Sequence, residues 1–175
     1  FRIRHRTINR AWTSRPTPRL DSFSEDLTDL ARSERIGFLI GHTGEYDQLV
    51  DILARQSRPN VILLGEPTIG KETIVNHLAY RIAHDKVPPA LFDKRLVKFE
   101  MGNIVSGADQ AELTKRAQTI VDEILQAGNL ILFIPDIYNL VRTAEHSVIN
   151  ILDIFLPIFK GDLVQVVGTT NPRDY

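Results

Sequence analysis

The stretch VILLGEPTIGKETIV, residues 61–75, limits the possible folds of this chain more than any other part of the sequence. An apolar run is followed by a loop and then by apolar residues at helical spacing. The loop consists of Gly65, Glu66, Pro67, Thr68, Ile69, Gly70 and Lys71. Its glycines let main-chain N–H groups wrap closely around phosphate oxygens, and the helix start adds a positive dipole end. Lys71 can reach the outer phosphates as a point charge. The spacing therefore predicts a phosphate-binding loop between a strand and a helix.

Apolar runs and amphipathic segments alternate along the rest of the chain. Strands are predicted at residues 61–64, 96–101, 130–134 and 163–167. The wholly apolar runs at 61–64 and 130–134 are typical of strands buried on both faces of a parallel sheet. Helices are predicted at residues 45–56, 72–84, 112–126 and 147–160. The alternation predicts the α/β class, with helices on both faces of a mainly parallel sheet.

Single residues set the expected ends of several helices. A short helix containing Leu27 would be capped by Asp21 or Ser22. Gly128 is expected to close the helix at residues 112–126, because glycine readily takes the left-handed conformation of a C-cap. Pro157 is expected to end the last helix early, because proline lacks the N–H that an interior position needs.

Composition excludes several classes of function. The net charge of −1 gives the whole chain no electrostatic reason to bind nucleic acid, and the lack of cysteine excludes disulfides and thiolate metal sites. Charge is uneven, however, since the first 19 residues hold six arginines and no acidic residue. Residues 1–20 are interpreted as a basic linker or as a juxtamembrane arm, with a membrane helix before residue 1 in the second case. The chain is expected to be part of a longer protein.

Several blocks, in order from about Leu27 to Tyr175, resemble the first AAA+ ATPase domain of Clp-type unfoldases and disaggregases. The blocks are DLTDLAR, FLIGHTGEYDQLVDILARQ, ILLGEPTIGKETIVNHLAYRIAHDKVPPALFDKRLV, EMGNIVSGA, AGNLILFIPDIYNLV and VVGTTNPRDY. The resemblance implies a P-loop NTPase fold of the AAA+ type, a three-layer sandwich. Residues 21–175 would form the large α/β subdomain, and the helical lid of the family would lie beyond this chain.

The resemblance also implies ligands, partners and site residues. ATP or ADP with Mg²⁺ would bind residues 65–73, Glu72 and Thr73 included, and Leu39 and Ile40 would line the adenine pocket. Asn171 falls at the sensor position that orients the attacking water. The domain would assemble with copies of itself or a paralogous subunit in a hexameric ring, and would act on a protein substrate or with a protease partner. Its location would be the cytoplasm, or the cytoplasmic face of a membrane.

Four departures from the family pattern concern the chemistry. Glu72 stands where such loops carry the Ser or Thr that ligates Mg²⁺, and Thr73 is about 100° further around the helix and cannot replace it. Pro135 and Asp136 stand where the family has a metal-holding Asp and a catalytic Glu. Thr68 replaces a glycine and would be strained at positive φ. The pore loop of the family carries an aromatic residue, which is missing after Gly107-Ala108.

These departures leave three hypotheses open. The first is a nucleotide-binding module with weak or lost hydrolysis, because the phosphate cradle is mostly main chain while the chemistry depends on the altered side chains. The second is a slow ATPase in which Asp136 and Asn171 are catalytic and Glu72 and Asp136 serve as substitute metal ligands. The third is a nucleotide-free scaffold, in which Asp136 is only a helix or turn cap.

Overall fold

The computed structural model describes residues 14–57, 60–138 and 151–173. Most of the predicted basic arm lies outside these ranges, as does the first part of the helix predicted at residues 147–160. Within them, no helix is both long enough and apolar enough to cross a membrane.

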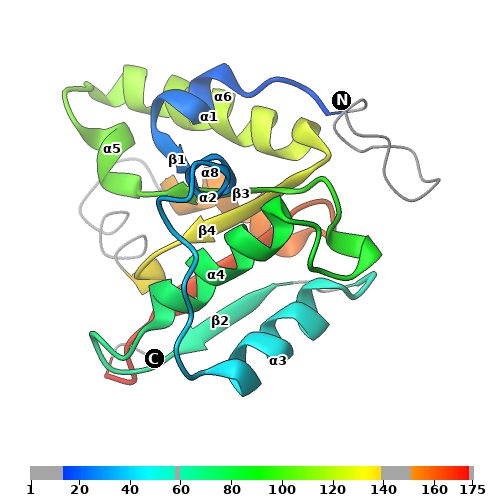
Figure 1. Ribbon diagram of the computed structural model, residues 1–175. Coiled ribbons are helices and arrows are strands. Elements are labelled where there is room, and N and C mark those ends of the chain that lie inside the picture. Colours follow the sequence, from blue (N-terminus) through cyan, green and yellow to red (C-terminus); the bar gives the residue numbers. More distant parts are fainter. Residues whose placement is uncertain (1–13, 58–59, 139–150, 174–175) are drawn as a thin grey trace.

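Five strands form one sheet in the order β1-β3-β4-β5-β2 (Figure 1). The four strands β2 (Val61–Leu64), β3 (Arg95–Phe99), β4 (Leu130–Ile134) and β5 (Gln165–Thr170) run parallel to their neighbours. The short β1 (Ser24–Asp26) pairs with β3 in the antiparallel direction. The predicted α/β class and mainly parallel sheet are therefore confirmed.

Helices cover both faces of this sheet and complete three layers (Figure 1). One layer contains α2 (Leu27–Arg32), α3 (Thr43–Leu53) and α4 (Lys71–Ala83). The other contains α1 (Pro18–Ser22), α5 (Met101–Val105), α6 (Gln110–Ala127) and α8 (Ile151–Lys160). A short 3₁₀ helix, η2 (Pro89–Leu91), precedes β3. Side chains alternate between the layers along β4, where Leu132 faces α6 and α8 while Phe133 faces α4.

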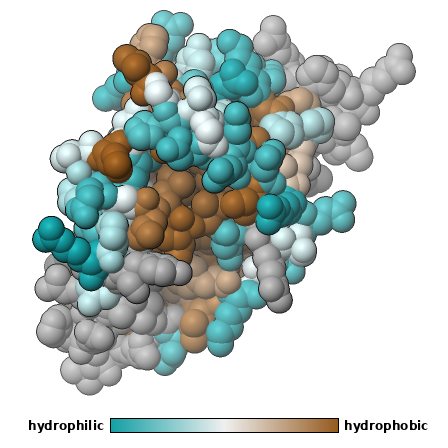
Figure 2. All heavy atoms as spheres, turned by 90° about the horizontal axis from the view of Figure 1, so that it is seen from below, coloured by the Kyte–Doolittle hydropathy of each residue, from teal (hydrophilic) through white to brown (hydrophobic). Residues whose placement is uncertain are grey.

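One prediction about strand burial is wrong. The run at residues 61–64 was expected to be buried on both faces, yet Ile62 and Leu64 are 50% and 52% exposed. The reason is position, because β2 is the last strand of the described sheet and packs on α3 and α4 through Val61 and Leu63. Figure 2 shows apolar surface on the side seen from below, where β2 forms the edge.

Two predictions about helix ends are also wrong. Asp26, rather than Asp21 or Ser22, caps α2, and its side chain accepts a hydrogen bond from the N–H of Asp29. Pro157 lies inside α8, which continues to Lys160. Burial of Phe155 and Ile158 in the core holds α8 together across the hydrogen bond that proline cannot donate. The expected C-cap is confirmed, since Gly128 has φ of 80° at the end of α6.

Polar contacts dock the N-terminal elements onto the sheet. The guanidinium of Arg95 donates to Thr17, Asp21 and Asp26, at 2.9–3.0 Å. We call these four residues the Arg95 clasp. The expected boundary of the arm, at residue 20, falls inside α1, and Leu20 is fully buried.

Candidate nucleotide site

A pocket of about 530 Å³ lies between the phosphate loop and the carboxyl ends of β4 and β5. Because β2, β4 and β5 are parallel, their carboxyl ends meet at one edge of the sheet, where α/β proteins bind ligands. Eight predicted site residues line the pocket: Pro67, Thr68, Gly70, Lys71, Glu72, Thr73, Asp136 and Asn171. The structure thus brings together residues that are about 100 positions apart in the sequence.

The conformation of the loop depends on its two glycines. Gly70 has φ of 98° and is the N-cap of α4, so a side chain there would be strained. Gly65 needs to be small for another reason, since a Cβ atom on it would lie 2.9 Å from Cγ2 of Ile69. Thr68 has φ of 68°, so the positive φ considered for this position is observed. The loop therefore keeps its glycine-dependent turn and adds strain at one threonine.

Lys71 starts α4 and turns back across the loop. Its ammonium group donates to the carbonyl oxygens of Gly65 and Glu66, the second at 3.1 Å. It also donates to Oδ1 of Asn171 at 3.2 Å. The lysine and the residue at the predicted sensor position are therefore in direct contact at the pocket.

Pro135 and Asp136 form a turn directly after β4. Asp136 has φ of 48°, and its main-chain N–H donates to Oγ1 of Thr169 on β5 at 2.9 Å. Both residues line the pocket, together with Thr169 and Thr170. The carboxylate of Asp136 is therefore carried on a turn rather than on the strand itself.

Glu72 forms an ion pair with a residue from β3. Nζ of Lys98 lies 3.3 Å from Oε2 of Glu72 and 3.2 Å from Oε1 of Glu100. Burial by itself lowers the pKa of Lys98, but the negative charge of Glu72 and hydrogen bonds to both carboxylates outweigh it, so the pKa is raised. Lys98 is therefore charged at neutral pH, and it balances a carboxylate at the wall of the pocket.

Comparison with known proteins finds ClpC proteins among the relatives of this chain. ClpC/MecB of Bacillus subtilis (strain 168), a negative regulator of genetic competence, is 35% identical over 161 residues, 91% of this chain. ClpC of Staphylococcus aureus (strain USA300), the ATP-binding subunit of an ATP-dependent Clp protease, is 35% identical over 93% of it. The chain belongs to the Clp-type AAA+ family. It spans about a fifth of the length of these curated relatives, 20% in each case.

Solved structures of the AAA+ chaperone Hsp104 have the same fold. The Saccharomyces cerevisiae Hsp104–ADP complex has a TM-score of 0.74 at 29% identity, covering 87% of this chain and 21% of that one. Hsp104 with ATPγS and FITC-casein has a TM-score of 0.79 at 28% identity, over 90% and 27% of the two chains. No protein-family model matches the sequence.

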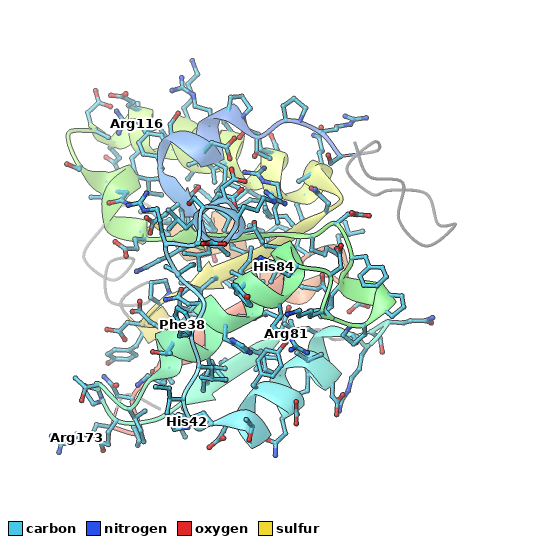
Figure 3. All side chains as sticks on the ribbon, viewed as in Figure 1. Phe38, His42, Arg81, His84, Arg116 and Arg173 are labelled. Atoms are coloured by element: carbon cyan, nitrogen blue, oxygen red, sulfur yellow. The ribbon has the colours of Figure 1, made fainter. Side chains whose placement is uncertain are left out.

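In this AAA+ domain, the two residues expected to line the adenine pocket, Leu39 and Ile40, do not line the phosphate pocket. Leu39 borders a second pocket, of about 420 Å³, with Gly37, His77 and Tyr80. Ile40 is 93% exposed. The segment that carries them runs beside α4, where His77 Nδ1 lies 2.8 Å from the carbonyl oxygen of Gly37 (Figure 3). The structure therefore does not bring these two residues to the phosphate pocket.

Sequence reasoning missed several groups at the site. Pro135, Thr169 and Thr170 were noted as parts of motifs but were not predicted to line the pocket. His42 was not among the predicted site residues, yet a Cβ atom on Gly70 would lie 3.6 Å from its Nε2. The order of the strands would have identified the threonines, because β5 is the parallel neighbour of β2. No signal in the sequence identified His42.

The side chains present do not match the family's magnesium centre. Glu72, which is paired with Lys98, stands where the family has the Ser or Thr that ligates Mg²⁺. Pro135, whose side chain has no ligand atom, stands where the family has the metal-holding Asp. Among residues 14–57, 60–138 and 151–173, no group of three or more His, Asp or Glu side chains is arranged to hold a metal ion. Asp136 remains as a carboxylate at the pocket wall.

Proposed function

We propose that this AAA+ domain binds ATP or ADP and hydrolyses ATP weakly or not at all, within a larger chaperone-like assembly. The observation that carries the proposal is the contrast within one pocket. Part of the glycine-dependent loop, Lys71 and Asn171 line the pocket with the geometry that phosphate binding would need, whereas Pro135 and Asp136 stand where the family has its acidic pair. Phosphate affinity depends mainly on main-chain amides and the lysine, while hydrolysis needs a general base and an oriented metal.

The names of the relatives support the nucleotide and the assembly. One is an ATP-binding subunit of a Clp protease, and an Hsp104 structure contains ADP. From the family resemblance, a ring of identical or paralogous subunits, a protein substrate and a protease partner are expected of the full-length protein, with the cytoplasm as the expected location.

The domain is not expected to grip a polypeptide as its relatives would. The segment after α5 is a short turn in which Gly107 has φ of 68°. Asp109 then caps α6 by accepting from the N–H of Glu112 at 2.8 Å. Residues 106–109 contain no aromatic side chain. Any pulling force in the assembly would therefore come from another domain or subunit.

A slow ATPase is the second candidate, because Asp136 lines the same pocket as Lys71. A titration with a fluorescent ATP analogue, combined with phosphate release on the same samples, separates the possibilities. We expect saturable binding that weakens at least about tenfold in Lys71→Ala, close to 1.4 kcal/mol, and phosphate release near background. The exposed Lys115→Ala serves as the matched charge control. Lys71-dependent phosphate release would favour the slow ATPase, and absence of binding would favour a scaffold.

A further inference from the structure

Lys98 is placed to act on the nucleotide site although it is not part of the phosphate loop. It lies on β3, which is not adjacent to β2, and reaches across to the start of α4. Its side chain is 21% exposed, whereas its partners Glu72 and Glu100 are 56% and 51% exposed. The half-buried lysine is thus the fixed member of this charge cluster.

Without Lys98, Glu72 would oppose binding of a polyphosphate. Glu72 is the second residue of α4, directly after Lys71, and it lines the pocket. A carboxylate this close to the outer phosphates repels them, and the repulsion is strongest when no metal ion reduces their charge. An ammonium group 3.3 Å away reduces this field at short range, although it is shared with Glu100.

The same ion pair reduces the contribution that a magnesium ion at this site would make to the affinity for nucleotide. A metal ion that recruits Glu72 competes with Lys98 for its carboxylate, and displacing Lys98 would leave the half-buried ammonium with Glu100 alone. Pro135 offers no second carboxylate, and the remaining one, Asp136, is carried on the turn after β4 rather than on the strand. Binding of the metal at this position therefore adds little to the affinity for nucleotide.

We propose that the Lys98–Glu72 ion pair replaces the hydroxyl and magnesium ion at this position, so that the domain binds nucleoside di- and triphosphates without a divalent cation. The inference rests on the proposed nucleotide binding, and it names Lys98 as the residue that makes Glu72 compatible with the ligand. Lys98 is a positioning residue, since it acts through Glu72.

The first test is calorimetric titration of the chain with ADP, in excess magnesium and in excess EDTA. We expect dissociation constants within about threefold of each other. A dissociation constant at least about tenfold higher in EDTA would overturn the inference and leave nucleotide binding intact. Absence of binding in both buffers would overturn the proposed function as well, so the two failures are distinguishable.

Three variants test the role of the ion pair. Lys98→Met is expected to weaken ADP binding about tenfold in EDTA, with partial recovery in magnesium as Glu72 is released. Glu72→Gln/Lys98→Met is expected to return to within about threefold of the native chain, because both charges are gone. The control Lys115→Met removes one positive charge on the surface of α6. Unchanged binding by Lys98→Met in EDTA would overturn the inference.

The variant Glu72→Gln tests whether the domain binds nucleotide without magnesium, and it does so even if Lys98→Met does not fold. The side chain of Glu72 is largely exposed, so this variant is expected to keep the thermal stability of the native chain. We expect equal affinity in magnesium and EDTA, at least as high as that of the native chain. A loss of affinity only in magnesium would show that Glu72 is a metal ligand and would overturn the inference.

Discussion

Thr68 occupies the left-handed region of backbone conformation in the middle of the phosphate loop, with φ of 68°. A β-branched residue is disfavoured there, because its Cβ atom crowds the following carbonyl group. Glycine would have no such cost. The threonine therefore strains the loop that is expected to bind the phosphates.

Thr68→Gly is expected to raise the free energy of unfolding by up to about 1.5 kcal/mol. The estimate sets relief of roughly 1–2 kcal/mol of left-handed strain against the greater chain entropy of glycine, about 0.5–1 kcal/mol. Urea unfolding measures the change. Thr68→Ala, which keeps Cβ but removes the branch, should fall between the two. A glycine variant less stable than the native chain would contradict the strain.

The sequence could identify individual site residues only where a motif fixed their place. The loop and Asn171 were found from spacing and order along the chain. The pairing of Glu72 with Lys98 was not, because it depends on how α4 lies across β3, which spacing along the chain does not encode. Ile40 was assigned to the adenine pocket from register alone, and it does not line the phosphate pocket.

At the scale of secondary-structure elements, α8 contains a proline that costs stability. Pro157 is exposed and lies within Ile151–Lys160, where a helix interior needs its N–H. Pro157→Ala is therefore expected to raise the free energy of unfolding by about 1–3 kcal/mol. Thermal and urea unfolding measure it, with the exposed Asp153→Ala on the same helix as control. A less stable alanine variant would mean that the proline is needed for the packing of α8.

The Arg95 clasp predicts how stability depends on pH. Burial alone raises the pKa of Asp26, but hydrogen bonds from Thr28 and Arg95 outweigh it, so the pKa is lowered in the fold. Folding therefore favours the charged carboxylate. Its contribution is complete above the pKa of the unfolded chain, about 3.9, and is lost as the pH falls through the lower pKa of the folded state.

Asp26→Asn is expected to lower the free energy of unfolding at neutral pH by about 1–3 kcal/mol, because hydrogen bonds to a charged group are lost. The difference from the native chain should shrink as the pH falls below about 4. Urea unfolding at several pH values measures both effects. Glu25→Gln, an exposed residue on the same strand, should show neither. A difference that stays constant with pH would contradict the ionic role of Asp26.

Long elements could be predicted from periodicity, and short ones could not. Each of the four predicted strands overlaps an observed strand, and β2 and β4 match at both ends. In contrast, α1, β1 and α5 have five, three and five residues and no period long enough to read. Tertiary contacts define them, such as the carboxylate of Glu123 on α6, which accepts from the N–H groups of Arg19 and Leu20.

At the scale of the whole molecule, the phosphate pocket joins elements from both halves of the chain. A ligand there contacts α4, the turn after β4 and the end of β5, so it should resist unfolding of the sheet as one unit. At a concentration about a hundred times the dissociation constant, ADP is expected to stabilise the domain by about 2.7 kcal/mol. For a chain of this size, that corresponds to a rise in Tm of roughly 5–10 °C. Lys71→Ala should show a much smaller rise, and an equal rise would place the ligand elsewhere.

The main-chain amides of residues 65–73 are the groups expected to hold the phosphates, and their NMR signals report on that contact directly. In ¹H–¹⁵N spectra of the native chain titrated with ADP, we expect the largest shifts at Gly70, Lys71 and Glu72. Inorganic pyrophosphate should move the same signals in the same direction. Shifts that spare this loop, or none at millimolar ADP, would contradict the claim that the cradle still binds nucleotide after its acidic partners have changed.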